Sequence, residues 1–520
     1  MAKRKRDNAD KAGALKSRKE DAASTPKQAA RVEVAYVKTK TDAVNGDDKS
    51  TAQAVSTTKD AEAGAETSTF QIITGSYERV LHGFAATIPR SLVTGHEDAT
   101  ASEADKPKID FTDTFLFNAH ASAVRCLALS PLSEETSKIT LATGATDERI
   151  NLYSLSTAPP TISKNRLKLP SLGGNSITEN PKNKELGSLL HHSSNITALY
   201  FPTRSKLLSA AEDSTIAITR TRDWTALSTI KAPIPKPQGR PSGDTAGPGE
   251  VPSGINDFAV HPSMKLMVSV GKGEKCMRLW NLVTGKKAGV LNFGREILSA
   301  VGEGRFGSGE GRGVIWDNEG EEFAVAFERG VVLFGIDSKP KAKILPTPKT
   351  KIHQMHYLPS KSHPNTLLVS TEDGRVLLYD TTTTTTSENA EDAKEDDIPP
   401  SKLIAQVGGP AAGISGRVKD FEVLPFSAAD TSLFLIVTGS SDGTVRLWSL
   451  DIEELKGGDG AEQEKGLTAK QVGHLLGTYS TGTRITCLKS FAMTGTPDKE
   501  EEEEVEIEKD VESSSDEEGA

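Results

Sequence analysis

A short two-strand pattern recurs along this chain and constrains the fold more than any other feature of the sequence. Its clearest copy is TGSSDGTVRLWSL at residues 438–450, where a polar turn at Asp442 and Gly443 separates two runs of alternating apolar residues. Asp-Gly between alternating apolar residues is typical of a β-hairpin. Because an isolated hairpin is marginally stable in water, the copies must bury their apolar faces against one another.

Six further segments share the arrangement of an apolar strand, a turn and a second strand. They are IITGSYERVLHGF from Ile72, LATGATDERINLYSL from Leu141, LLSAAEDSTIAIT from Leu207, VSVGKGEKCMRLWNL from Val268, FAVAFERGVVLFGI from Phe323 and LLVSTEDGRVLLYD from Leu367. Another apolar strand precedes most copies, as in HASAVRCLALS, NITALYF, INDFAVHP and RVKDFEVL. The sequence therefore predicts seven units of four strands each.

The residues of these units resemble the WD-repeat motif. In that motif a His before the first strand, a Ser or Thr on the second, an Asp in the turn and a Trp on the third hydrogen-bond in series. One unit contains His120, Thr143 and Asp147, with Tyr153 in place of Trp, whereas the unit at Phe323 lacks both the turn Asp and the Trp. The resemblance implies an all-β fold, a seven-bladed WD40 β-propeller.

The two ends of the repeat region are expected to meet in one blade. TRITCLKSF, from Thr483 to Phe491, matches the first strand of a unit but follows the last motif. It is expected to join strands at Phe70–Thr74, Arg79–Ala85 and Asp113–Phe117, which removes the open sheet edges at the seam. The propeller is therefore predicted to span residues 70–491 as one domain.

Polar insertions explain why consecutive motifs begin roughly 45 to 70 residues apart, when a WD unit needs about 40–45. The sequence predicts that these insertions are surface loops, because they are rich in Gly, Pro, Thr or charged residues. They comprise residues 88–110, 157–186, 232–253, 300–313, 381–400 and 452–470.

The charge of the chain is concentrated at its ends. Residues 498–520 contain thirteen acidic residues and two lysines, a net charge of -11 beside the -10 of the whole chain. Residues 1–69 are predicted to be a disordered arm and 492–520 a disordered acidic tail. The arm contains two basic clusters that resemble a bipartite nuclear import signal, or that are simply a solvated basic terminus. The clusters are Lys3, Arg4, Lys5, Arg6, Lys16, Arg18 and Lys19.

The acidic tail has three alternative interpretations. Ser513, Ser514 and Ser515 precede acidic residues and resemble the site of an acidic-directed kinase. The tail could also mimic nucleic acid toward basic proteins, or serve only solubility.

Five blocks, in order, are similar to the WD-repeat family of PAK-interacting proteins: GSYERVLHGFA, HHSSNITALYF, VSVGKGEKCMRLWNLVTG, GRVKDFEVLP and TRITCLKSF. The fungal, maintenance-of-killer type members of that family are nucleolar assembly factors of the large ribosomal subunit. The resemblance implies a non-catalytic scaffold in the nucleus and nucleolus, with assembly factors and pre-60S particles as partners. It also implies a direct or indirect contact with pre-rRNA.

Catalytic and cofactor motifs give weaker indications. GxGxxG occurs at Gly302, Gly304 and Gly307, but a nucleotide site needs a strand before it and a helix after it. A flexible loop is preferred, in which Arg305 and Arg312 could at most touch RNA phosphates. We assign no catalytic, cofactor-binding or metal-ligating residue.

Other compositional signals favour a reduced protein outside membranes. The three cysteines lie far apart, which favours neither a disulfide framework nor a zinc site. No apolar run approaches the roughly 18 residues of a membrane span, and the amino-terminal residues resemble no secretion signal. A monomer without a membrane partner is expected.

Binding residues are expected on the propeller rim. Arg125, Arg417, Lys419 and Arg484 fall at the starts of first strands, near the rim that WD proteins commonly use for partners. Each is either a partner contact or an ordinary exposed charge. Two alternatives to the assembly scaffold remain, a signalling adaptor that negatively regulates a PAK-type kinase and a nucleotide-binding enzyme or hydrolase.

Overall fold

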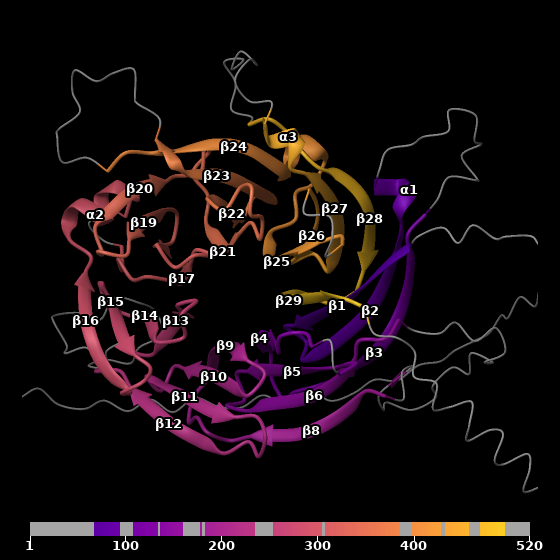
Figure 1. The fold of residues 1–520 in the computed structure, drawn as a ribbon, viewed down its shortest axis with the longest axis horizontal. Helices are drawn as coiled ribbons and strands as arrows, with labels where there is room; N and C mark the ends of the chain where they lie inside the picture. Colours follow the sequence, from indigo (N-terminus) through magenta and orange to yellow (C-terminus); the bar gives the residue numbers. More distant parts are fainter. Residues whose placement is uncertain are drawn as a thin grey trace, which may run out of the picture. The chain divides into compact units, whose positions relative to one another are not determined.

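The computed structural model describes a ring of seven antiparallel β-sheets (Figure 1). The described residues are 67–93, 108–133, 136–159, 177–178, 182–234, 253–303, 307–384, 398–427, 432–456 and 469–494. The predicted seven-bladed propeller is confirmed within this part of the chain. The predicted arm and tail fall almost entirely outside the described residues.

The closing blade joins the two ends of the repeat region, as predicted. Its strand order is β29 (Ile485–Ala492), β1 (Thr67–Ser76), β2 (Val80–Pro89), β3 (Asp110–Asn118) and β7 (Ile177–Thr178). The register of β1 against β29 runs from Phe70 opposite Ala492 to Ser76 opposite Ile485. Figure 1 shows the yellow β29 beside the indigo β1. One feature was not expected, because β7 lies in an insertion predicted to be a loop and yet adds a fifth strand.

The other six blades have four strands each. One consists of β4 (Val124–Leu129), β5 (Lys138–Ala145), β6 (Ile150–Ser156) and β8 (Lys184–Leu189). The next consists of β9 (Ile196–Thr203), β10 (Lys206–Ala211), β11 (Thr215–Arg220) and β12 (Ala226–Lys231). A third consists of β13 (Ile255–Val260), β14 (Leu266–Gly271), β15 (Cys276–Asn281) and β16 (Lys286–Asn292). A fourth consists of β17 (Gly313–Trp316), β18 (Glu322–Ala326), β19 (Val331–Gly335) and β20 (Pro340–Ile344). A fifth consists of β21 (Ile352–Tyr357), β22 (Thr366–Thr371), β23 (Arg375–Thr384) and β24 (Ser401–Gly408). The last consists of β25 (Val418–Pro425), β26 (Leu433–Ser440), β27 (Thr444–Asp451) and β28 (His474–Ser480).

Short helices lie between strands of the described residues, and two of them, α1 (Arg90–Val93) and α3 (Glu453–Lys456), fall within predicted insertions. The others are α2 (Arg295–Ala300) and the single turn η1 (Pro410–Ala412). The threonine run differs from its prediction, because β23 continues to Thr384 instead of ending before Thr381. Thr381 is buried there, and β-branched side chains suit an extended strand.

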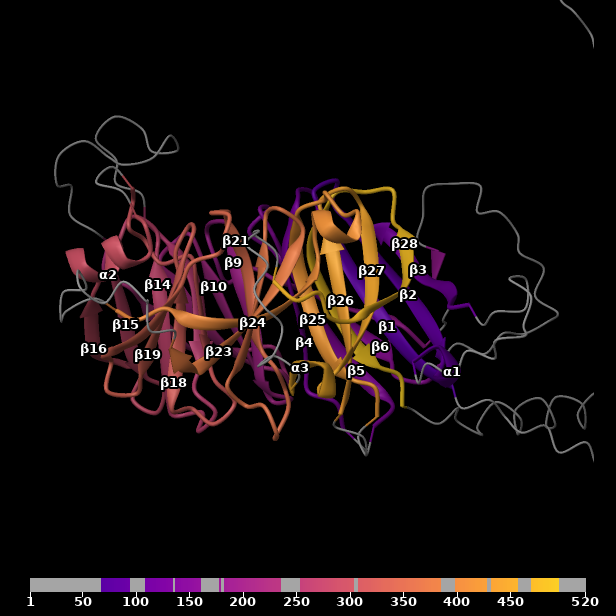
Figure 2. The ribbon, with the colours of Figure 1, turned by 90° about the horizontal axis from the view of Figure 1, so that it is seen from above.

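The innermost strands close the ring around the central axis. Going round, β29 contacts β4, and the order continues through β9, β13, β17, β21 and β25 back to β29. Seen from the side, the strands run across the thickness of the ring, so their connections lie at two rims (Figure 2). All seven innermost strands therefore begin at one rim, where β29 starts, and end at the other.

The hydrophobic core lies between neighbouring blades. Phe70 and Ile72 of β1 share one buried cluster with Leu435 and Val437 of β26, and with Leu488 of β29. Each middle strand is therefore covered on both faces, whereas the outermost strands β12 and β16 are largely exposed. This packing explains why a single hairpin of this sequence could not remain folded alone.

The hairpin at Asp442 and Gly443 has the turn that its sequence predicts. Gly443 has φ 84°, in the left-handed region that favours glycine. The Asp442 carboxylate accepts hydrogen bonds from the backbone N–H (2.9 Å) and the hydroxyl (2.6 Å) of Thr444. The turn is therefore fixed by local contacts, before any packing between blades.

Candidate functional site

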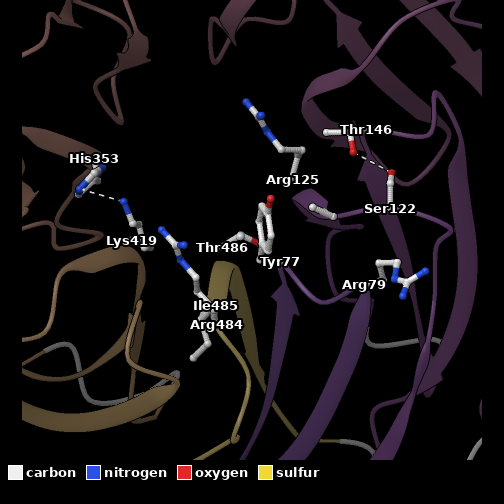
Figure 3. A pocket seen from close by; sticks show the side chains of 11 residues that line it. Tyr77, Arg79, Ser122, Arg125, Thr146, His353, Lys419, Arg484, Ile485 and Thr486 are labelled. Carbon is white, nitrogen blue, oxygen red and sulfur yellow. Dashed lines mark hydrogen bonds between the residues drawn. The ribbon is translucent and has the colours of Figure 1, made fainter. Parts of the chain in front are cut away.

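A cavity of about 700 Å³ opens at the rim where the innermost strands begin (Figure 3). Its charged and aromatic lining residues are Tyr77, Arg79, Arg125, His353, Lys419 and Arg484, and Ser, Thr, Ala and Ile residues complete the lining. We call it the basic mouth cavity. The described residues of its lining include no Asp or Glu, so the cavity suits an anionic group.

Local irregularities in the innermost strands bring two of these side chains to the cavity. The register of β4 against β5 shifts around Arg125, and that of β25 against β26 shifts around Lys419. A β-bulge leaves its extra residue outside the pairing and redirects its side chain. Arg125 and Lys419 therefore occupy equivalent places in two blades. In Figure 3 the Arg125 side chain extends into the space between the labelled residues, and the Lys419 side chain points toward His353.

Three of the four predicted rim residues meet in this cavity. Arg125, Lys419 and Arg484 line it, although they come from three different blades. The fourth, Arg417, lies outside the lining, and its Nε is 3.2 Å from Oε1 of Glu372. The structure thus assembles most of the set, and Arg417 instead forms an ion pair.

Three of the six charged and aromatic lining residues were not among the predicted rim positions. Tyr77 and Arg79 belong to the turn between β1 and β2, and His353 is the second residue of β21. His353 follows the first residue of its strand just as Arg125 and Lys419 do, so its position in the repeat was a usable signal. The exposed Tyr77 of the GSYER turn carried no such signal.

Specific contacts hold the basic side chains in place. The Lys419 Nζ donates to Nε2 of His353 at 3.3 Å (Figure 3). The Arg484 guanidinium carbon lies 5.7 Å from the centre of the Tyr77 ring, a cation–π distance. Tyr77 is 61% exposed, so the outer part of its ring remains available to a ligand.

The pKa shifts in the cavity reflect burial and repulsion between cations. Burial, together with the charge of Lys419, lowers the pKa of His353 to about 4. A neutral imidazole can accept the hydrogen bond from Lys419. Burial and the neighbouring Arg417 also lower the pKa of Lys419, with a contribution from Arg484. An anion bound here would relieve that repulsion.

The histidine of the WD motif has a structural role in two blades. In the first, the His120 Nε2 shares a hydrogen bond of 2.7 Å with the Thr143 hydroxyl, and its Nδ1 lies 3.1 Å from the Asp147 carboxylate. The series predicted from the sequence is therefore confirmed for this blade. Because these groups satisfy one another in a buried place, they stabilise the fold.

The second blade repeats the arrangement around His192. Its Nε2 is 2.8 Å from the Ser209 hydroxyl and its Nδ1 is 3.2 Å from the Asp213 carboxylate. His192, and not His191, thus occupies the structural position of the repeat. These contacts give His192 a structural partner on each ring nitrogen.

Two blades use the tryptophan of the motif. The Trp280 Nε1 donates to the Ser269 hydroxyl at 2.8 Å, and the Trp448 Nε1 donates to the Thr438 hydroxyl at 3.3 Å. Both indoles are buried. Each therefore ties its blade's third strand to its second through a buried hydrogen bond.

Buried aspartates connect neighbouring blades near the axis. Asp257 of β13 accepts a hydrogen bond of 2.9 Å from the Val314 N–H of β17, and Asp420 of β25 accepts one of 2.8 Å from the Leu488 N–H of β29. Burial raises the pKa of Asp257 to about 7 and that of Asp420 to about 6. Their backbone partners indicate a structural role.

The remaining motif candidates do not form a site in the described residues. The glycine-rich segment follows helix α2 and precedes strand β17, the reverse of the order in a nucleotide-binding loop. Arg312 lies 3.8 Å from the Glu328 carboxylate. Within the described ranges, no three His, Cys, Asp or Glu side chains gather as metal ligands would, and the three cysteines are free thiols.

Two predicted sites cannot be placed. The basic clusters at residues 3–6 and 16–19 and the serines at 513–515 lie outside the described residues. Among the helices of the described part, none is long and apolar enough to cross a membrane.

Comparison with known proteins identifies the repeats. The family model described as WD domain, G-beta repeat matches residues 183–219 and 426–449. The chain is 24% identical over 430 residues to a p21-activated protein kinase-interacting protein 1-like of Xenopus laevis, covering 83% of this chain and 84% of that protein.

Two fungal proteins are also similar. Protein MAK11 of Saccharomyces cerevisiae is 28% identical over 411 residues, which cover 74% of this chain and 79% of that protein. Shk1 kinase-binding protein 15 of Schizosaccharomyces pombe is 28% identical over 176 residues, 34% of this chain and 42% of that protein. The first of these similarities extends over most of the repeat region.

Proposed function

From its WD40 repeats and its match to the WD-repeat family of PAK-interacting proteins and MAK11, we propose that this chain is a non-catalytic scaffold for assembly of the large ribosomal subunit. It acts in the nucleolus, where it binds assembly factors and pre-60S particles during processing of pre-rRNA. The similarity to MAK11 over 79% of that protein is the observation that carries the proposal.

The structure supports a binding role through a rigid rim. Loops and strand ends from several blades meet at the basic mouth cavity. A propeller holds such a surface in fixed geometry because each blade packs on its neighbours. The cavity is the surface that we assign to an acidic partner of the assembly pathway.

Purification of the tagged full-length chain, followed by sequencing of the copurified RNA, tests the proposal. Large-subunit precursor RNA is expected at least tenfold above an untagged control. The triple variant R125Q/K419Q/R484Q is expected to reduce that recovery, because it removes three cations from the rim. Recovery of no such RNA by the unmodified chain would refute the assembly role.

A matched control separates the cavity from general charge. Lys231, Lys286 and Lys287 are exposed on the outermost strands β12 and β16, so K231Q/K286Q/K287Q removes the same charge elsewhere. This control is expected to recover precursor RNA like the unmodified chain. Equal losses in both triple variants would contradict a specific role of the rim.

The second candidate is an adaptor that binds and negatively regulates a PAK-type kinase. The names of the Xenopus laevis and Schizosaccharomyces pombe relatives, which describe kinase interaction and kinase binding, favour it. A stable cytoplasmic pool without a nucleolar signal, together with copurification of such a kinase, would support this function over assembly. Imaging of a fluorescent fusion and mass spectrometry of the purified material distinguish the two.

Transport into the nucleus is assigned to the amino-terminal arm. We propose that Lys3–Arg6 and Lys16–Lys19 form the import signal. Replacing all seven basic residues of the two clusters by glutamine is expected to leave a fluorescent fusion in the cytoplasm. Unchanged nuclear signal would show that import uses another segment.

A further inference from the structure

Within the described residues, three cations of the basic mouth cavity form no ion pair, unlike two neighbouring cations of the same rim. Arg417 pairs with Glu372, and Lys351 pairs with Glu328 at 2.9 Å. Within the described residues, by contrast, no carboxylate forms an ion pair with Arg125, Lys419 or Arg484. Two carboxylates lie near these cations: Glu372, the partner of Arg417, also acts to raise the pKa of Lys419, and Glu78 accepts a hydrogen bond of 2.9 Å from the Arg484 backbone N–H. The cations Arg79, Arg125, Lys419 and Arg484 outnumber them, so the described lining keeps an excess of positive charge.

The same chain carries a segment of opposite charge. Residues 498–518 contain all thirteen acidic residues of the carboxyl-terminal region and two lysines. Their number exceeds the charge that the cavity presents, so part of the segment would suffice to neutralise it. The last described residue before the segment is Thr494, which is separated from Asp498 by three residues.

We propose that residues 498–518 bind in the basic mouth cavity of their own propeller and are displaced by the acidic partner of the assembly scaffold. The proposal rests on the proposed function in that the same cavity serves the partner. It adds a regulatory state in which the chain covers its own binding surface. Because the segment is tethered, its effective concentration is in the millimolar range, so weak contacts are sufficient.

The geometry of β29 sets the length that the segment must span. β29 begins beside the cavity at Ile485 and ends at Ala492 on the other rim. Eight residues of strand cover about 26 Å, at about 3.3 Å per residue. A chain that returned over the same distance would need about eight residues after Met493, so Glu501 and the following acidic residues would be level with the cavity.

A path around the outside of a blade also remains within reach. Four strands about 4.8 Å apart make a blade about 15 Å wide on each rim, so this route measures about 56 Å with the thickness of the ring. It requires about 17 residues at 3.3 Å each and reaches the cavity near Asp510. Glu512 and the acidic residues at 516–518 would then occupy it.

The shape of the site favours an acidic peptide over RNA. A single-stranded RNA needs an extended basic groove that follows its backbone, with several aromatic platforms for the bases. The described lining of the cavity instead has one exposed aromatic ring, Tyr77, and its cations gather around a single open cavity. The carboxylates of an acidic peptide can each pair with one of these cations.

Zero-length carbodiimide crosslinking of the dilute full-length chain tests the contact directly. Lys419 is the only lysine among the described residues that line the cavity, so it is expected to become linked to a glutamate of residues 500–512. A mixture of light and heavy isotope-labelled chains distinguishes links within one molecule from links between two. Crosslinks of the segment to Lys231, Lys286 and Lys287 as frequent as those to Lys419 would overturn the proposal.

Binding of a free peptide tests whether residues 498–518 of the same chain already occupy the cavity. The probe is a fluorescent peptide of residues 498–518, and the tail-neutral protein is the full chain with its thirteen acidic residues from 498 to 518 changed to the corresponding amides. The probe is expected to bind the tail-neutral chain at least tenfold more tightly than the unmodified chain. Equal affinity for both would overturn binding in cis.

Cavity variants locate the binding. In the tail-neutral chain, R125Q/K419Q/R484Q is expected to weaken the probe at least tenfold, whereas K231Q/K286Q/K287Q remains within twofold. The charge-conserving R125K/R484K is expected to retain most of the affinity, which excludes simple misfolding as the cause. Tighter binding of a twelve-nucleotide single-stranded RNA than of the probe to the cavity would assign it to nucleic acid and overturn the proposal.

The experiments distinguish failure of tail binding from failure of the proposed assembly role. If the tail-neutral chain and the unmodified chain bind the probe equally but both recover precursor RNA, only the tail proposal fails. If the probe binds as expected but no precursor RNA is recovered, the assembly role fails.

Discussion

Removal of β29 tests how strongly the ring depends on its closing strand. The perturbed chain ends after Ser480, and the matched control ends after Thr494, so that only the first lacks β29. Ile485, Leu488 and Phe491 of β29 are at most 3% exposed. At about 1.5–3 kcal/mol for each fully buried side chain, their loss removes about 5–9 kcal/mol.

This loss is comparable with the whole stability of a folded domain, which is about 5–15 kcal/mol. The truncation also removes seven pairs of residues in register with β1 and leaves an open sheet edge. The chain ending at Ser480 is therefore expected to show no cooperative unfolding and to aggregate at the edge of β1. The chain ending at Thr494 is expected to unfold like the full-length protein.

Urea unfolding followed by circular dichroism measures both chains. Addition of a synthetic peptide of residues 483–494 is expected to restore part of the cooperative transition to the shorter chain, because it supplies the missing strand. The reasoning is refuted if the chain ending at Ser480 unfolds cooperatively, with the same urea midpoint as the control.

Three further substitutions test individual contacts. His120→Ala is expected to lower the free energy of unfolding by about 1–3 kcal/mol, because Thr143 loses its buried partner; an unchanged urea midpoint would contradict this. Gly443→Ala is expected to cost about 1–3 kcal/mol, because φ 84° strains any other residue and the new Cβ would lie 2.7 Å from the Thr483 carbonyl oxygen; calorimetry measures it. Burial raises the pKa of Asp257 to about 7, so the folded protein holds a proton that the unfolded chain releases, and this contribution to stability declines as pH rises from about 4 to 7. In urea titrations, the free energy of unfolding of Asp257→Asn is therefore expected to rise relative to that of the unmodified chain between pH 5 and pH 8. A difference in unfolding free energy that stays constant with pH would argue against the raised pKa of Asp257.

Several parts of the fold could be predicted because their signals are local. The Asp-Gly turn, the alternating strands and the His120, Thr143 and Asp147 series are each encoded within a few tens of residues. The match of Thr483–Phe491 to a first strand also predicted the closure, because a repeat that lacks one strand must obtain it elsewhere in the chain. The added strand β7 was missed, since two residues carry no periodic signal.

The basic mouth cavity is a product of the tertiary structure. Arg125, Lys419 and Arg484 were selected from the sequence as strand-start positions, but only the ring brings three blades together and places Arg417 beside Glu372 instead. Tyr77 joins them because β1 ends at the rim where β29 begins. Hairpins follow from contacts between neighbouring residues, whereas a binding surface follows from the closure of the ring and from bulges that redirect single side chains. The sequence by itself therefore determined the repeating unit and its number, and the tertiary structure decided which charges share a site.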